Sequence, residues 1–270
     1  MIEHLLQPLV SRRFNSDLHY RDGHLRVVNA LPTRRVIGLH IPQMKQLAKE
    51  ISRKGCEVVF EDGSRKRCLS GKEIIRCFEA VSSDTLCHEE CVVWGYLINS
   101  GRYSLDERLS MLESYIPILD NWAVCDSYCS HAKWMAGVDK RMLWSFLKQW
   151  YGSNKEFEVR FAIVVSMCYF LTDEWLDVVF KRVASIDFEC IVSNYKSVKK
   201  KPETPQQGTV QGISPYYVRM GVAWLLATAL AKYPDATRRF VSSSAIPYDV
   251  VKLYKRKARE SFRTRYVDAL

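Results

Sequence analysis

A tryptophan and an aspartate stand four residues apart in the stretch NWAVCDSYC, residues 121–129. Within a helix, this spacing places the side chains of Trp122 and Asp126 on the same face. An indole face attracts cations and a carboxylate stabilises developing positive charge, so the pair has the chemistry of a site for a cationic reaction centre. Taken singly, Trp122 is also typical of a helical core, and Asp126 of a solvated or capping acid.

Arginines inside two apolar helical segments can likewise be either site residues or structural residues. Arg160 lies in the first turns of EFEVRFAIV, and Arg219 and Trp224 lie in SPYYVRMGVAWLL. An arginine in an apolar helix is costly unless it is paired or faces a groove. Arg160 can pair with Glu156 or Glu158 of its own helix, and Trp224 can be an ordinary core residue. These segments therefore predict either interior contacts or a groove with charged and aromatic walls.

The chain is strongly basic. It has 40 Lys and Arg residues against 30 Asp and Glu, a net charge of +10. Residues 252–265, KLYKRKARESFRTR, contain seven basic residues and one acid, and KSVKKK at 196–201 forms a second basic cluster. Each cluster alone is compatible with a solvated face, but together with the net charge they favour binding to a polyanion, most simply nucleic acid.

Nine cysteines are scattered through apolar segments. An odd, scattered set argues for reduced thiols and against a disulfide framework. Cys87 with Cys91, and Cys125 with Cys129 and nearby His131, have spacings within the range of zinc ligands. Because each pair recurs at four residues inside an apolar pattern, core packing is the favoured interpretation and zinc the alternative.

The overall composition indicates a globular protein, with 47 % hydrophobic and 26 % charged residues. The N-terminus lacks the basic start, apolar stretch and cleavage site of a signal peptide. The longest apolar-rich run, residues 161–171, is too short to span a bilayer. We therefore expect a soluble, cytoplasmic protein.

Apolar residues recur at helical spacing almost throughout the chain, which predicts an all-α fold. Ser104 with Glu107 has the pattern of a capping box at a helix start. Residues 56–69 predict a β-hairpin insertion, and 199–213, rich in Pro, Gln and Gly, predict a mobile loop. The predicted helices cover residues 3–13, 42–54, 70–81, 85–100, 104–119, 121–135, 139–151, 154–171, 173–186, 188–198, 214–232, 235–243 and 247–263.

Short breaks between these helices favour antiparallel helix pairs. The first helices of successive pairs begin near 85, 121 and 154, which fits an α-solenoid of HEAT-like pairs with a concave face. A compact helical bundle is the alternative. We expect one domain over residues 1–270.

Trp122, Asp126, Arg160 and Trp224, in this order and on first helices of successive pairs, resemble the DNA alkylation repair family of alkylpurine DNA glycosylases. The segments VIGLHIPQMKQLAK, residues 36–49, and HEECVVWGYLI, residues 88–98, are similar to the N-terminal part of that family. The resemblance spans roughly residues 25–265. Its motifs are short, and their order and spacing carry the specificity.

The resemblance implies a site in the concave groove of a helical-repeat protein that binds double-stranded DNA. The two tryptophans would contact the deoxyribose, Asp126 would be the catalytic carboxylate, and Arg160 would belong to the same site. It also implies that no flipped base needs to be held in a pocket. With the charge pattern, it predicts DNA contacts from Arg160, Arg219, Tyr217, His40, Lys199, Lys200, Lys255 and Arg256.

The chain departs from the family pattern at three places. His40 stands in the GLHIP turn where an uncharged polar residue such as Gln is expected. The 56–69 segment is longer than usual, and the 199–213 segment resembles an insertion. The first departure affects contacts near the alkylated base, and the other two affect how tightly the protein binds DNA.

The residues also fit hydrolysis of a glycosidic bond when they are considered without the family resemblance. Glycosidic hydrolysis usually requires two carboxylates, whereas the sequence offers Asp126 no convincing partner. A purine alkylated at N3 or N7 is already cationic and leaves without a proton, so one carboxylate suffices to stabilise the sugar cation and orient water. Arg160 would hold a phosphate beside the lesion.

We therefore predict a monomeric DNA glycosylase that releases 3-methyladenine and 7-methylguanine, without lyase activity and without a metal or organic cofactor. Two alternatives remain. A helical-repeat protein of this kind can bind damaged or branched DNA without excising a base, or can serve as a scaffold for a protein partner.

Overall fold

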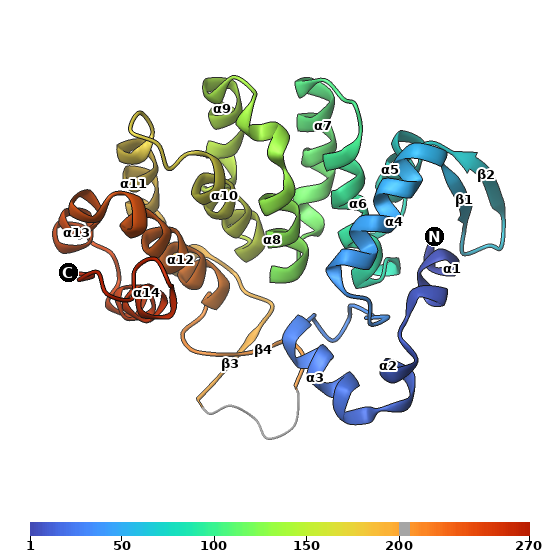
Figure 1. The fold of residues 1–270 in the computed structure, drawn as a ribbon, viewed down its shortest axis with the longest axis horizontal. Helices are drawn as coiled ribbons and strands as arrows, with labels where there is room; N and C mark the ends of the chain where they lie inside the picture. Colours follow the sequence, from blue (N-terminus) through green and yellow to red (C-terminus); the bar gives the residue numbers. More distant parts are fainter. Residues whose placement is uncertain (200–205) are drawn as a thin grey trace. The chain divides into compact units, whose positions relative to one another are not determined.

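The computed structural model describes residues 1–199 and 206–270, and this part of the chain is all-α, with 63 % of residues in helices (Figure 1). Its helices are α1 (Glu3–Leu6), α2 (Arg12–Ser16), α3 (Leu18–Val28), α4 (Ile41–Lys54), α5 (Gly71–Glu79), α6 (His88–Ser100), α7 (Leu105–Tyr115), α8 (Trp122–His131), α9 (Lys140–Trp150), α10 (Glu156–Tyr169), α11 (Leu176–Ala184), α12 (Tyr216–Lys232), α13 (Pro234–Ser243) and α14 (Tyr248–Glu260). The strands are β1 (Cys56–Val59), β2 (Arg65–Leu69), β3 (Lys196–Val198) and β4 (Thr209–Gln211).

The described residues form two compact units. The N-terminal unit contains residues 1–134 with 206–209, and the C-terminal unit contains residues 135–199 with 210–270. The prediction of one domain over the whole chain stays a prediction.

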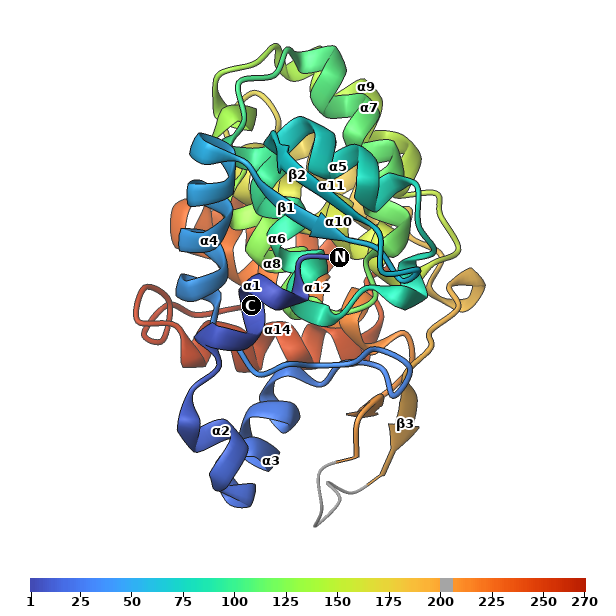
Figure 2. The same ribbon diagram turned by 90° about the vertical axis from the view of Figure 1, so that its right-hand side faces the viewer.

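The N-terminal unit is built around α6. Residues 88–98 of this helix are all buried, and α4, α5, α7 and α8 pack against it; Figure 2 shows α4 and α5 beside it. Beyond its first turn, where His88, Glu89 and Glu90 are buried, this helix is mostly apolar on every side and must be covered on every side, which explains its central position. The buried cysteines Cys87, Cys91, Cys125 and Cys129 lie in this core, so the predicted core packing of these thiols is confirmed.

The C-terminal unit is built around α12 in the same way. Most residues of α12 are buried, and α10, α13 and α14 pack against it. The predicted all-α class is thus confirmed, and helices packed on helices in both units are consistent with a helical-repeat fold. Among the described residues, no helix has the length and apolar character needed to cross a membrane.

Several local predictions are confirmed. The capping box at α7 forms, because the Ser104 side chain accepts a hydrogen bond from the Glu107 backbone and Glu107 accepts one from the Ser104 backbone. The hairpin also forms: β1 and β2 are antiparallel, and Val59 pairs with Arg65.

Other helix predictions are wrong. The predicted helix 188–198 is a short 3₁₀ turn, Phe188–Cys190, followed by an extended segment. The Val192 N–H donates to the Asn154 carbonyl (2.7 Å), and the Val192 carbonyl accepts from Glu156 (3.3 Å). These backbone groups pair with the start of α10, so they are not used in a helix.

The predicted helix 3–13 is broken in two. A 3₁₀ turn containing Pro8 interrupts it, and Ser11 caps α2 by accepting from the Phe14 N–H. The apolar pattern does not predict helix α3, because Val28 is its one buried residue. The Asp17 side chain nevertheless caps it by accepting from the Tyr20 N–H (3.0 Å).

Candidate active site

The start of α8 is fixed by a buried asparagine. The Asn121 Oδ1 atom accepts from the Ala123 N–H (2.8 Å), which caps the helix. The Asn121 amide donates to the carbonyls of Val28 (2.6 Å) and Asn29 (3.1 Å) at the end of α3. The first residue of α8 is Trp122, so this asparagine determines where the indole lies.

Trp122 and Asp126 are both half-buried on α8. The Trp122 Nε1–H donates to the Val27 carbonyl (3.1 Å), which fixes the orientation of the ring. Because both residues lie within one regular helix, four positions apart, they share a face as their spacing predicts. The structure thus provides an oriented indole with a partly accessible carboxylate one turn further along.

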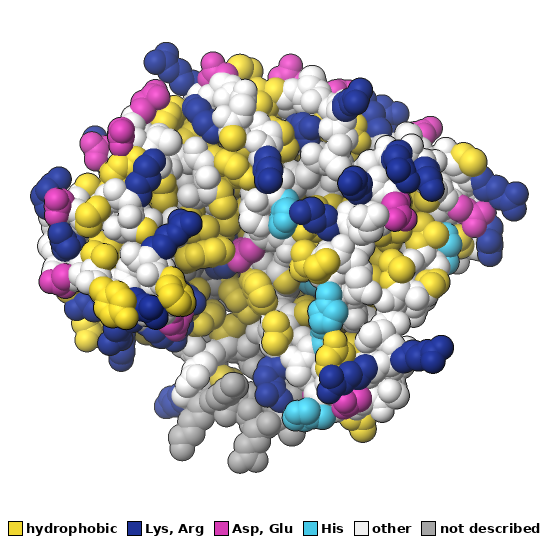
Figure 3. Space-filling model, in the orientation of Figure 1, with side chains coloured by type: hydrophobic (Ala, Val, Ile, Leu, Met, Phe, Trp, Pro, Cys, Tyr) yellow, Lys and Arg dark blue, Asp and Glu magenta, His cyan; other side chains and the backbone are white. Residues whose placement is uncertain are grey.

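The indole also lines a pocket of about 510 Å³. Tyr20 and His24 of α3, His40 before α4 and His88 of α6 contribute further rings to its walls. The Tyr20 hydroxyl and the His40 Nε2 atom are hydrogen-bonded at 2.8 Å, and the His24 and His40 rings meet edge to face with centroids 5.2 Å apart. Figure 3 shows histidine side chains among hydrophobic and basic ones near these N-terminal helices. The volume lies within the range of small-molecule sites.

Burial disfavours the charged form of two imidazoles that line this pocket. Burial lowers the pKa of His88 to about 4, and burial, followed by the charge of His40, lowers the pKa of His24. His24 Nε2 and His88 Nδ1 are shielded from solvent and have no hydrogen-bond partner among the described residues. Desolvation explains both shifts, because a charged imidazole without a partner is costly in an apolar wall.

Burial of His88 predicts a loss of stability in acid. Its pKa falls from an ordinary value of 6.5 in the unfolded chain to about 4 in the fold. Between these values only the unfolded chain takes up the proton, so stability is fully present above pH 6.5 and decreases toward pH 4, by up to ~3 kcal/mol. Urea unfolding at several pH values, with His88→Gln as the comparison, measures this. The wild type should lose more unfolding free energy over this window than the variant, and equal losses would refute the assignment.

A buried glutamate holds the wall that carries His40. The Glu89 carboxylate, fully buried on α6, accepts the backbone N–H groups of Ile37 (2.9 Å), Gly38 (2.7 Å) and Leu39 (3.3 Å). Gly38 has φ 105°, and a Cβ there would lie 2.5 Å from the Phe14 ring, so glycine is required. The two segments quoted for the family resemblance, 36–49 and 88–98, are therefore bonded to each other.

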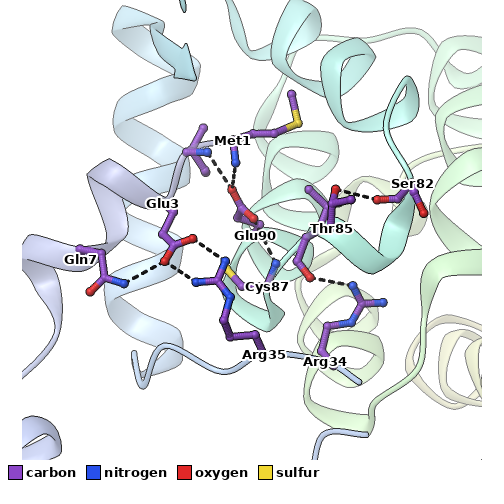
Figure 4. Close-up of polar contacts among 11 residues, drawn as sticks. Met1, Glu3, Gln7, Arg34, Arg35, Ser82, Thr85, Cys87 and Glu90 are labelled. Atoms are coloured by element: carbon purple, nitrogen blue, oxygen red, sulfur yellow. Dashed lines mark hydrogen bonds and ion pairs between the residues drawn. The ribbon is translucent and has the colours of Figure 1, made fainter. Parts of the chain in front are cut away.

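The neighbouring Glu90 has a parallel role (Figure 4). Its Oε1 atom accepts from the Met1 amine (2.6 Å) and the Ile2 N–H (2.7 Å), and its Oε2 atom accepts from the Cys87 N–H (3.1 Å). In the same view, Arg35 pairs with Glu3. The start of α6 thus anchors the first residues of the chain as well as the turn before α4.

The described end of the 199–213 segment reaches the same region. The Gly208 N–H donates to Asn29 Oδ1 (3.2 Å), and the Asn29 amide donates to the Thr209 carbonyl (2.9 Å). Asn29 is also bonded to Asn121 (3.1 Å). This end of the segment is therefore held beside the start of α8, while residues 200–205 lie outside the described part.

In the C-terminal unit, Arg160 is buried on α10, with 3 % of its surface exposed. Its Nη1 atom donates to the Tyr217 carbonyl (2.6 Å), and its guanidinium lies 5.7 Å from the Tyr217 ring centroid. Glu156 accepts from the Tyr217 N–H (2.6 Å), and a Cβ at Gly221 would lie 3.4 Å from Arg160 Nη1. The arginine is thus seated against the first turns of α12.

Trp224 is half-buried on α12, although its neighbours Ala223 and Leu225 are fully buried. Its carbonyl accepts from the Thr228 hydroxyl (2.9 Å). The indole is therefore partly accessible in an otherwise buried stretch of the helix. Trp134, Trp144 and Trp150 are half-buried as well, so the place of Trp224 in a site stays a prediction.

Arg219 and Tyr217 are engaged inside the C-terminal unit. Arg219 pairs with Asp249 (3.2 Å) and Glu189 (3.3 Å), and its guanidinium lies 4.7 Å from the Phe188 ring centroid. Tyr217 packs against the rings of Phe157, Tyr195 and Tyr216. These contacts support structural roles, and the DNA contacts of both residues stay predictions.

The remaining predicted DNA contacts lie at the surface. Lys199, Lys255, Arg256 and His40 are exposed, and Arg256 lies 3.5 Å from Glu260. Lys200 lies outside the described residues. Exposure is what phosphate binding requires of such side chains.

The structure brings the predicted site residues together in two pairs. Trp122 and Asp126 share a face of α8 in the N-terminal unit, and Arg160 is bonded to Tyr217 in the C-terminal unit. A site formed by Trp122, Asp126, Arg160 and Trp224 together stays a prediction.

The sequence interpretation missed the walls of the pocket. Tyr20, His24 and His88 come from segments far apart in the chain, and no local pattern links them to Trp122. One signal was available: HYRDGH, residues 19–24, places an aromatic ring between two histidines. Among the described residues, no group of three or more His, Cys, Asp or Glu side chains could hold a metal ion.

The protein is all-α, carries an oriented indole and a carboxylate on one helix, and exposes basic residues. These are features of a helical protein that acts on nucleic acid. The family model of the DNA alkylation repair enzyme matches residues 24–188, more than half of the chain. The chain therefore belongs to this family, and its role lies in DNA repair. The match includes His40, Trp122, Asp126 and Arg160. The comparisons with curated proteins and with solved structures found no significant match.

Proposed function

We propose that the chain is a monofunctional DNA glycosylase that hydrolyses the N-glycosidic bond of cationic N3- or N7-alkylated purines in duplex DNA. The observation that carries this proposal is the Trp122–Asp126 pair, with its indole held by Val27 and its carboxylate one turn away. The family supports a DNA substrate with alkylation damage.

The chemistry needs one carboxylate near the breaking bond. An alkylated purine that already carries a positive charge is a good leaving group and requires no general acid. Asp126 belongs to the same helix as Trp122 but is not among the residues that line the pocket beside Trp122. Asp126 stabilises the oxocarbenium character of the deoxyribose and orients the attacking water.

The aromatic and basic residues bind the substrate. Trp122 and Trp224 lie against the sugar, where indole faces favour the developing cation by about 0.5–2 kcal/mol each. Arg160 is buried and bonded to the Tyr217 carbonyl, so its proposed contact with a backbone phosphate requires the guanidinium to become accessible when DNA binds. Exposed lysines and arginines contact further phosphates. The protein acts as a monomer in the cytoplasm and uses no cofactor.

The test is the release of free base from DNA methylated to carry 3-methyladenine and 7-methylguanine. We expect both bases to be released and an abasic site to remain uncleaved, since no lyase step is involved. Absence of release by folded protein that still binds this DNA would leave a non-catalytic DNA-binding function. Absence of DNA binding at moderate salt would favour a scaffold for a protein partner.

The basic residues of α14 predict the salt dependence of DNA binding. Lys255→Ala with Arg256→Ala removes two exposed charges, so the slope of log K against log salt should decrease by about two units. Lys148→Ala, which removes an exposed charge from α9, serves as the control and should change the slope less. A salt titration of DNA affinity measures both. An unchanged slope in the double variant would exclude these two residues from the DNA interface.

A further inference from the structure

The segment that follows α14 exposes two aromatic rings. Phe262 is 84 % exposed and Tyr266 is 87 % exposed. The guanidinium of Arg265 lies 4.0 Å from the Phe262 ring centroid and 4.9 Å from that of Tyr266. Large aromatic side chains are usually packed, so two of them at the surface around one arginine form a distinct feature. We call Phe262, Arg265 and Tyr266 the aromatic–arginine cluster.

This cluster is carried by a fixed segment of the chain. Thr264 is buried, and its hydroxyl donates to the Ala258 carbonyl of α14 (2.7 Å). The Arg265 N–H donates to the Ser261 carbonyl (2.9 Å), and further on the Tyr254 hydroxyl donates to the Ala269 carbonyl (2.9 Å). The rings are therefore presented to solvent by a bonded turn, and little order has to be gained when they bind a ligand.

The surroundings of the cluster are basic. Residues 252–265 contain seven Lys or Arg and one acid, and the acid, Glu260, pairs with Arg256 and Lys257. Figure 3 shows hydrophobic side chains bordered by basic ones over α14. A polyanion with flat, apolar faces matches both properties, and nucleobases on a phosphate backbone have this combination.

We propose that the aromatic–arginine cluster binds unstacked bases of single-stranded DNA. The inference rests on the DNA-binding part of the proposed function. In an intact duplex the base faces are covered by their neighbours, whereas in a single strand or a gap they are free to stack on Phe262 and Tyr266. The flanking Lys and Arg residues bind the phosphates between them. This site lies beyond the residues matched by the family model, which end at 188.

The test compares single-stranded with duplex DNA. Phe262→Leu with Tyr266→Leu removes the aromatic faces and keeps apolar bulk and charge. Tyr248→Leu is the matched control, since Tyr248 is an aromatic residue 82 % exposed at the start of α14, the helix that precedes the cluster. Fluorescence anisotropy with a labelled oligothymidine strand and with a duplex of the same length gives the affinities.

We expect the double variant to lose about ten-fold in single-strand affinity, with duplex affinity within about two-fold and an unchanged salt slope. Tyr248→Leu should retain both affinities. An unchanged single-strand affinity in the double variant, an equal loss in Tyr248→Leu, or a wild type that does not bind the single strand would each overturn the proposal. Loss of binding to phosphatidylglycerol vesicles with unchanged single-strand affinity would assign the cluster to a lipid surface instead.

Base release from methylated duplex DNA is measured on the same proteins, so that the two proposals can fail separately. The double variant should release base at the wild-type rate. If the wild type releases no base, the glycosylase assignment fails, while the single-strand comparison still decides the role of the cluster.

Discussion

Asp126→Asn is expected to reduce the rate of base release at least about a hundred-fold and to leave DNA affinity unchanged or higher. Removing a preorganised electrostatic group from a transition state costs on the order of 10²–10³ in rate. The same substitution removes a negative charge that faces a polyanion, so binding to the substrate should not weaken. Single-turnover release from methylated DNA and an affinity titration separate these two effects.

The structure makes this substitution a fair test, because the cap of α8 is Asn121 and not Asp126. Asp126 is half-buried, and asparagine has nearly the same shape, so the fold should persist. Glu113→Gln, at an exposed carboxylate on α7, is the matched control and should release base normally. Wild-type rates from the Asp126→Asn protein would remove this residue from the chemistry, and loss of the folded state would make it a structural residue.

The sequence predicts best what depends on neighbours in the chain. The shared face of Trp122 and Asp126 needs one regular helix and a spacing of four, and the capping box at Ser104 needs two residues three apart. The central helices α6 and α12 are recognisable because they are mostly apolar on every side. These features are set by helical geometry and local hydrogen bonds, so the pattern is enough.

The pocket beside Trp122 depends on distant parts of the chain. Its walls come from α3, the turn before α4, α6 and α8, and the hydrogen bonds that assemble them, such as Trp122 to Val27 and Ile37 to Glu89, join residues far apart in the sequence. Helix α3 has little apolar periodicity because it contributes few buried residues, so its position beside α8 follows from Asn121 and not from its own sequence. The burial of Arg219 could not be predicted either, because its partners Asp249 and Glu189 each lie 30 residues away from it in the sequence.

Glu89→Gln is expected to reduce the free energy of unfolding by about 1–3 kcal/mol. The fully buried carboxylate accepts the Gly38 and Leu39 N–H groups at Oε1 and the Ile37 N–H at Oε2, whereas a glutamine with its oxygen in the place of Oε1 turns its NH₂ group toward the Ile37 N–H. Each buried donor left without a partner costs about 1–3 kcal/mol. Urea unfolding measures the loss, with Glu50→Gln on the exposed side of α4 as the control.

A second readout of the same variant tests what Glu89 contributes beyond stability. The three N–H groups belong to the turn that leads into His40, and His40 forms the pocket wall with Tyr20. A displaced turn should change the environment of the His40 ring, which its imidazole NMR signals report at temperatures where the variant is fully folded. A variant as stable as wild type would show that the turn holds its shape without the carboxylate. A destabilised variant with unchanged His40 signals would show that Glu89 stabilises the core but does not set the shape of the turn. The turn would then be fixed by its packing around Gly38 and Phe14.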